Sequence, residues 1–194
     1  MPSLSAPSVP LSQVGRAAHD VGLAVLLGGN LFGRMALHPS VSEISDQSER
    51  GRVVNAAWRR YGVIQSLSLA AVIGGWAGAR LDEAADRRLT PEERRLARAK
   101  DVLVGLVGVT GVATAAQGMA FSRKAPNGAV PLSDGEHAAP QASEDAKRAK
   151  RRVNVRDLAS LVSELALVSV NAALEQRQHR RPAVRRLVPF VGRT

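Results

Sequence analysis

The stretch from Val102 to Phe121, VLVGLVGVTGVATAAQGMAF, contains no charged side chain. Its length of about 20 residues matches the hydrocarbon core of a bilayer, about 30 Å thick, at a rise of about 1.5 Å per helical residue. A soluble amphipathic helix would carry a polar stripe, whereas Gln117 is the only strongly polar side chain here. A chain of 194 residues is too small to bury such a helix on every side. The stretch therefore predicts a membrane-spanning helix.

Three further segments are depleted of charge: Val21 to Gly33, Tyr61 to Ala79, and Leu158 to Leu174, which is interrupted only by Glu164. Arg-rich segments lie between them, so the mean hydropathy of the whole chain is slightly negative although 23% of the residues are charged. Four such segments predict an all-α fold, a four-helix transmembrane bundle with long helices extending beyond the membrane.

Local signals place the first two helices. The first is expected from about Leu11 to Leu37, because the His-Pro-Ser sequence that follows removes a backbone donor and disfavours helical geometry before the proline. Asp46, with Glu49 three residues later, resembles a capping box at the start of the second helix. Nothing in the sequence interrupts this second helix before about Arg87.

The third helix has the clearest start, the sequence TPEE from Thr90, which offers an N-cap, a proline in the first turn and two acidic residues. The segment from Ala125 to Ser143, APNGAVPLSDGEHAAPQAS, is rich in Pro, Gly and Ser and predicts a flexible loop that buries little. The expected organisation is a single membrane domain with its first three helices in 1–122, the loop in 123–143, the fourth helix in 144–180 and a basic tail in 181–194.

Four spans place both ends of the chain on one side of the membrane. We name this side A, which also carries residues 80–101; side B carries residues 34–60 and 122–157. Lys and Arg are almost equally divided between the two sides, so the positive-inside rule does not decide the orientation. The net charge of +10 favours contact with the lipid bilayer and its anionic headgroups over nucleic acid, because no recognition motif accompanies the basic runs.

Polar side chains inside the spans are the candidate functional residues. Glu164 is costly in a bilayer, and Ser160, Leu167 and Asn171 share its helix face by spacing. By depth, one cluster is expected in the half of the membrane nearest side B: Glu164, Arg34, Asn30, Gln65 and Gln117. We expect Glu164 to pair with Arg34, which would make the cluster structural. An ion or proton site at Glu164, or a lipid headgroup contact by Arg34, is the alternative.

Small residues recur at helical spacing and predict close helix packing, in a tight bundle or a homo-oligomer or against another membrane protein. They are Gly29 and Gly33 in the first helix, Gly74 and Gly78 in the second, and Gly105, Gly108 and Gly111 in the third.

The run GGNLF from Gly28, followed by Pro39 and then by RGRVV from Arg50, resembles the first half of small four-span bacterial membrane proteins of the transmembrane-protein-205-like group. The resemblance covers about a third of the chain. Members of this group have no known function, so the resemblance implies a four-span fold but no catalytic residue and no ligand.

No nucleotide-binding, metalloprotease or serine-hydrolase motif is present, there is no Cys, and the four His residues lie far apart. We therefore expect no enzyme, cofactor or metal. The sequence favours a small structural or interaction component of a bacterial plasma membrane. The alternatives are a small proton-coupled transporter or channel subunit that uses Glu164, and a soluble basic helical protein that binds nucleic acid.

Overall fold

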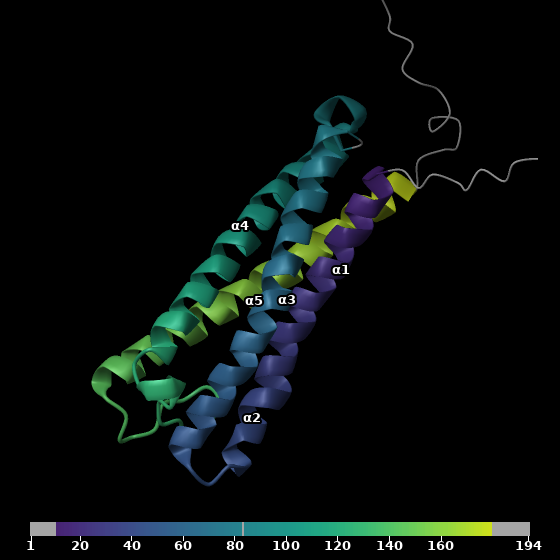
Figure 1. Cartoon of the computed structure of the whole chain (residues 1–194). Helices are drawn as coiled ribbons and strands as arrows, with labels where there is room; N and C mark the ends of the chain where they lie inside the picture. The colour runs from purple at the N-terminus through teal and green to yellow at the C-terminus, as the bar shows by residue number, and fades with distance from the viewer. Residues whose placement is uncertain (1–10, 83, 180–194) are drawn as a thin grey trace, which may run out of the picture.

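The computed structural model of the chain describes residues 11–82 and 84–179. These residues form helices and turns with no strand, apart from one isolated bridge between Leu132 and Ala138. The long helices are α1 (Leu11–Phe32), α3 (Gln47–Leu81), α4 (Pro91–Ser122) and α5 (Glu144–His179), with single 3-10 turns η3 (Asp86–Arg88) and η4 (Pro126–Gly128) between them. The predicted all-α four-helix bundle is confirmed (Figure 1). The predicted basic tail in 181–194 lies outside the described residues.

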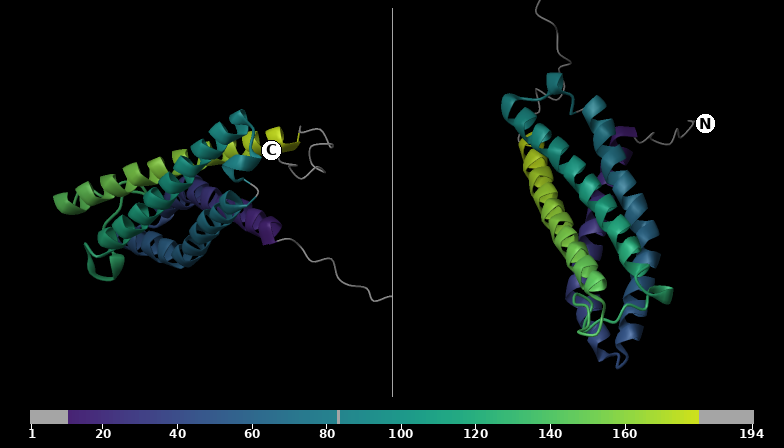
Figure 2. Two further views of the ribbon diagram at one scale, coloured as in Figure 1. Left: turned by 90° about the horizontal axis from the view of Figure 1, so that it is seen from above. Right: turned by 90° about the vertical axis from the view of Figure 1, so that its left-hand side faces the viewer.

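The bundle is built from two closely packed pairs, α1 with α3 and α4 with α5. Contacts of α3 with α4 and of α1 with α5 join the pairs into one body (Figures 1 and 2). The start of α1, the end of α5 and the turn between α3 and α4 lie at one end, which is side A. The segment 123–143 and the turn before α3 lie at the other end, side B.

The first helical stretch does not end at Leu37, and this prediction was wrong. It continues through a π-helical segment η1 (Gly33–Leu37), α2 (His38–Ser40) and a 3-10 turn η2 (Val41–Glu43). The N–H of His38 donates to the carbonyl of Gly33, five residues earlier. This wider turn directly precedes Pro39, which has no N–H and would crowd a regular helix. The bulge thus lets the helix pass the proline.

Asp46 and Thr90 cap the starts of α3 and α4 as predicted, but the capping box expected at Asp46 is incomplete and Glu49 pairs with Arg52 instead. Asp46 accepts hydrogen bonds from the N–H groups of Ser48 at 2.7 Å and Glu49 at 3.2 Å. Thr90 and Glu93 form a complete capping box. Helix α3, however, ends at Leu81 and not near Arg87. The chain leaves the helix there because Ala84 and Leu89 turn back into the core, where they are 2% and 6% exposed.

Two apolar cores fill the molecule. The larger runs through the bundle and includes Leu23, Leu26, Val72, Val107 and Leu167. The smaller lies at side B and consists of Val41, Val54, Val130, Leu132, Ala142 and Ala146, so it joins the segment 123–143 to α3 and α5.

The outer faces of the long helices are strongly apolar. On α4 alone, Val102, Val109 and Val112 are 71%, 69% and 62% exposed. The four helical stretches 13–43, 47–81, 91–122 and 144–179 are each long and apolar enough to cross a membrane. Such surfaces favour association in water but suit contact with lipid tails. The architecture therefore fits a small multi-pass membrane protein.

The segment 125–143 buries far more than its composition suggests, so the prediction that it has little to bury was wrong. Val130 and Leu132 are 1% and 0% exposed. The N–H of Leu132 donates to the carbonyl of Gln47, and that of Gly135 to the carbonyl of His38, both at 3.0 Å. The sequence did not reveal this burial, because the segment is attached by a few apolar residues and backbone hydrogen bonds that follow no periodic pattern.

Candidate intramembrane polar site

One face of α5 carries the polar residues of the bundle interior. Its buried positions repeat every three and four residues, the spacing that keeps side chains on one side of a helix. They include Lys150, Asp157, Ser160, Glu164, Leu167 and Leu174, all no more than 9% exposed, together with the small residues Ala146, Ala149 and Ser163. Asn171 continues the same repeat. The helix thus presents charged and polar groups to the interior along most of its length.

Glu164 is 2% exposed and sits against α1. The side-chain amide of Asn30 donates to both of its carboxylate oxygens, at 2.8 and 2.9 Å, and the hydroxyl of Ser160 donates to Oε1 at 3.1 Å. All of these partners are neutral. The carboxylate is therefore hydrogen-bonded, but no cation offsets its charge among the described residues.

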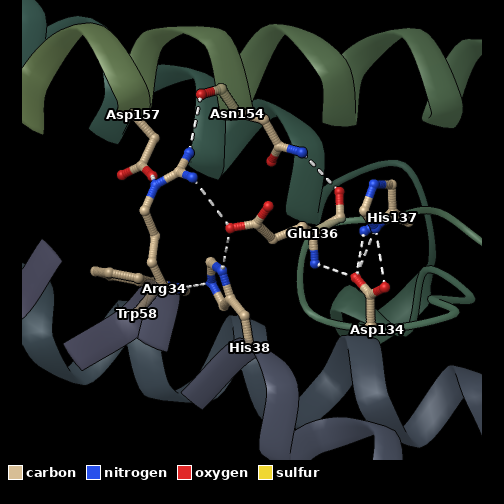
Figure 3. Close-up of polar contacts among 8 residues, drawn as sticks. All are labelled: Arg34, His38, Trp58, Asp134, Glu136, His137, Asn154 and Asp157. Atoms are coloured by element: carbon tan, nitrogen blue, oxygen red, sulfur yellow. Dashed lines mark hydrogen bonds and ion pairs between the residues drawn. The ribbon is translucent and has the colours of Figure 1, made fainter. Parts of the chain in front are cut away.

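Arg34 does not pair with Glu164, and that prediction was wrong. It extends from the π-helical segment toward α5, where its Nε donates to Asp157 Oδ2 at 3.0 Å (Figure 3). Its Nη1 lies 3.3 Å from Glu136 Oε1, and its Nη2 donates to the backbone carbonyl of Asn154 at 3.5 Å. One guanidinium therefore joins α5 and the segment 123–143 to the first helical stretch. We call this group the Arg34 clasp: Arg34, His38, Glu136, Asn154 and Asp157.

The clasp positions Glu136 from several directions. The side-chain amide of Asn154 donates to the Glu136 carbonyl at 2.6 Å, and His38 Nδ1 lies 3.7 Å from its carboxylate. Asp134 accepts hydrogen bonds from the N–H groups of Glu136 and His137, at 2.6 and 2.8 Å (Figure 3). Burial raises the pKa of Asp134, but the bonds from the His137 ring and these two N–H groups outweigh it, so the pKa lies below its ordinary value.

Two aromatic side chains of α3 close the same end of the bundle against glycines of the first helical stretch. Tyr61 lies against Gly29 and donates its hydroxyl proton to the Val25 carbonyl at 2.6 Å. Trp58 lies against Gly33 and donates its Nε1 proton to His38 Nε2 at 3.2 Å. A Cβ at either glycine would overlap the neighbouring ring. These glycines therefore make room for aromatic side chains rather than for a helix backbone.

The other predicted packing glycines divide into two groups. Gly108 and Gly111 of α4 face α3, where a Cβ would lie 3.3 Å from Ile73 and 3.5 Å from Leu69. Gly74, Gly78 and Gly105 have no neighbour within 4 Å of a Cβ. Three predicted positions thus lie on the outside of the monomer.

The two glutamines of the expected cluster do not reach Glu164. Gln117 accepts a hydrogen bond from Arg156, and Gln65 is half-buried on α3 without a hydrogen bond to the cluster. Sequence reasoning also missed Lys150, Asp157, Glu136 and His38. For Lys150 and Asp157 a signal existed, because both extend the three-and-four repeat of α5 toward side B. For Glu136 there was none, since a loop of 19 residues has no periodicity to reveal its inward face, and His38 was missed because the helix was expected to end before it, at Leu37.

No protein family, curated protein or solved structure matches this chain. The resemblance to the transmembrane-protein-205-like group therefore stays a prediction. The residues that the structure describes also include no group of three or more His, Asp or Glu side chains arranged to hold a metal ion.

Proposed function

We propose that this chain is a small multi-pass protein of a bacterial plasma membrane in which Glu164 binds and releases a proton, as part of a proton-coupled transporter or a channel subunit. The observation that supports the proposal is the difference between the partners of two side chains: Arg34 has charged partners, and Glu164 has neutral ones. Arg34, the cation that the sequence suggested as the partner of Glu164, contacts Asp157 and Glu136, while the hydrogen-bond partners of Glu164 in the described part of the chain are Asn30 and Ser160.

The chemistry follows from the cost of an isolated charge in a low-dielectric interior. An ionised carboxylate in a bilayer is expensive unless a cation lies beside it, whereas a protonated carboxyl is neutral. Hydrogen bonds from Asn30 and Ser160 offset part of the cost of the ionised form. Both forms of Glu164 are thus accessible, which is what a site that takes up and releases a proton requires.

A structural or interaction component of the same membrane is the second candidate, and a different observation favours it. In the Arg34 clasp, one guanidinium lies between two carboxylates from two other elements, and these ion pairs attach the segment 123–143 to the bundle. Gly74, Gly78 and Gly105 leave small positions on the outer face, where another helix or a second copy could approach. In this case Glu164 is only a hydrogen-bonding residue between α1 and α5.

The soluble nucleic-acid-binding alternative has less support. It would expose Val102, Val109 and the comparable side chains of the other helices to water. Membrane extraction tests this directly: we expect the chain to remain in the membrane pellet after carbonate treatment and to be released by detergent. Recovery in the carbonate supernatant would contradict the membrane proposal.

Infrared difference spectroscopy separates the first two candidates. In protein reconstituted into lipid, a change from alkaline to acidic buffer should produce the C=O stretching band of a protonated buried carboxyl. Glu164→Gln should remove this band, and Glu144→Gln, at the exposed start of the same helix, should leave it unchanged. A band that persists in Glu164→Gln would reject Glu164 as the proton site and leave the structural candidate.

A further inference from the structure

A second polar site lies in the half of the bundle nearest side A, about three helical turns along α1 from Asn30. A cavity of about 30 Å³ lies there between all four long helices. Its walls include His19 from α1, Trp76 from α3, Lys100 from α4 and Asn171 from α5. This volume accommodates one water molecule, and the polar walls offer it hydrogen-bond partners.

His19 is the titratable group of this cavity that has an unused hydrogen-bonding atom. The residue is 2% exposed, and its Nδ1 lies 2.7 Å from the Val72 carbonyl. A carbonyl oxygen only accepts, so Nδ1 carries the proton and Nε2 is left with its lone pair. Nε2 is fully buried without a protein partner. A buried ring nitrogen in this state needs a hydrogen-bond donor, and the cavity that His19 lines has room for a water molecule to supply one.

The charged groups around His19 come from three helices. Lys100 lies 4.2 Å from the Trp76 ring and donates to Asn171, which donates in turn to Asp20 at 3.1 Å and Glu175 at 3.0 Å. Helix α3 contributes no charged group to the cavity wall. The charged side chains that line the cavity with His19 are Arg16, Asp20, Lys100 and Glu175.

An apolar layer separates this cavity from Glu164. On α5, Leu167 lies between Glu164 and Asn171 and is 0% exposed. Leu23 and Leu26 of α1 and Val107 of α4 belong to the same buried core. Glu164 and Asn171 are seven residues apart, or about 10 Å along the helix. Polar groups therefore lie on both sides of a layer of buried apolar side chains.

We propose that His19 and a water molecule in the side-A cavity form the proton entry station for Glu164, and that the layer around Leu167 is the closed gate between them. This rests on the proton-binding function proposed above for Glu164. A hydronium ion on side A gives its proton to the Nε2 lone pair and becomes water, which leaves an imidazolium with Nδ1–H still on the Val72 carbonyl. When the layer hydrates, Nε2–H gives this proton to a water molecule, which becomes hydronium; the hydronium passes the proton to the Glu164 carboxylate, so that neutral histidine, water and a neutral carboxyl remain.

The test uses the full chain in vesicles of phosphatidylethanolamine and phosphatidylglycerol, with a pH-sensitive dye inside and an imposed pH gradient. Leu167→Ala makes room for water in the layer and should raise the proton flux about tenfold or more. Adding His19→Gln, which cannot take a proton, should return the flux to within about twofold of the unsubstituted protein. Leu132→Ala, an equally buried leucine of the side-B core, is the matched control and should leave the flux unchanged.

The double variants distinguish failure of this inference from failure of the proposed function. If the flux of Leu167→Ala persists with His19→Gln but is lost with Glu164→Gln, the inference is overturned and the proton-binding function of Glu164 stands. If the flux is lost with His19→Gln but persists with Glu164→Gln, the proposed function fails. No rise in the flux of folded Leu167→Ala overturns the gate.

A measurement on the unsubstituted protein covers the case in which Leu167→Ala does not fold. Solid-state NMR of protein with ¹⁵N-labelled histidine should show magnetisation transfer from water protons to Nε2 of His19. His179 at the end of α5 is exposed and serves as the positive control. Transfer to His179 without transfer to His19 would remove the water molecule from the cavity and overturn the proposal.

Discussion

Two charged side chains in the side-B half of the bundle, half-buried Arg34 and buried Glu164, have opposite surroundings. Arg34 touches two carboxylates and a backbone carbonyl, and these partners come from α5 and the segment 123–143. Glu164 touches an amide and a hydroxyl. A charge that meets its counter-charges is part of what holds elements together, whereas a charge held by neutral dipoles can be lost and regained at little structural cost. This difference is the basis of our proposal that Arg34 is structural and that Glu164 takes up and releases a proton.

The largest expected effect comes from removing the clasp charge. Arg34→Gln removes the guanidinium that contacts Asp157 and Glu136, leaves only the charge of Lys150 near them among the described residues, and should destabilise the protein by about 3 kcal/mol. Arg34→Lys should cost less, because the charge remains although the fork of donors is lost. Unfolding in detergent micelles measures both variants.

The double variant Arg34→Gln with Asp157→Asn should recover part of the lost stability. The reason is that the Asp157 carboxylate, which loses its guanidinium partner in Arg34→Gln, is replaced by a neutral amide. Arg34→Gln combined with Glu164→Gln should give additive losses, since these two side chains do not meet. If stability recovers in Arg34→Gln with Glu164→Gln but not in Arg34→Gln with Asp157→Asn, then Arg34 pairs with Glu164 and not with Asp157.

Packing of the segment 123–143 gives the next effect. A Cβ at Gly135 would overlap His38, so Gly135→Ala should cost about 2 kcal/mol and increase deuterium exchange in this segment. Gly118→Ala is the matched control, because a Cβ there meets nothing within 4 Å and alanine favours the helix. Equal stability of the two variants would mean that the segment does not lie against His38.

Glu164→Gln should cost less than about 1 kcal/mol, because glutamine keeps a hydrogen-bonding group at this position and resembles the protonated carboxyl in shape and charge. The same unfolding measurement applies. A loss as large as that of Arg34→Gln would show that the charge of Glu164 is structural.

The smallest effect concerns pH. The pKa of Asp134 is depressed in the folded protein, so its contribution to stability is present above its unfolded pKa and is lost as the pH falls through the folded value. Deuterium exchange in 123–143 should therefore rise in acid before the helices unfold. Asp134→Asn should lack this acid response, and an unchanged response in the variant would assign it to another group.

The sequence predicted the parts of the fold that have a period or a local signal. Four charge-depleted segments predicted four helices, and the caps at Asp46 and Thr90 were correct because they depend on neighbouring residues alone. The continuation past Pro39 could not be predicted, since it requires a π-bulge stabilised within the folded bundle.

The site was predicted less well for a physical reason. Depth in the membrane suggested a polar cluster toward side B, but it could not select the partners within it, and Gln65 and Gln117 do not reach Glu164. Arg34 is four residues from Asn30, and one helical turn was enough to direct it to Asp157 rather than Glu164. Glu136 completes the clasp from a segment whose packing the sequence did not reveal.

The contrast between the two charges is tested most directly by ¹³C NMR of the Asp and Glu carboxyl carbons in lipid bilayers, with assignments from Glu164→Gln and Asp157→Asn. As the pH falls from alkaline toward mildly acidic values, we expect the Glu164 carbon to move to the position of a protonated carboxyl while the Asp157 carbon beside Arg34 stays at the ionised position. A Glu164 carbon that remains ionised together with that of Asp157 over this range would contradict the account.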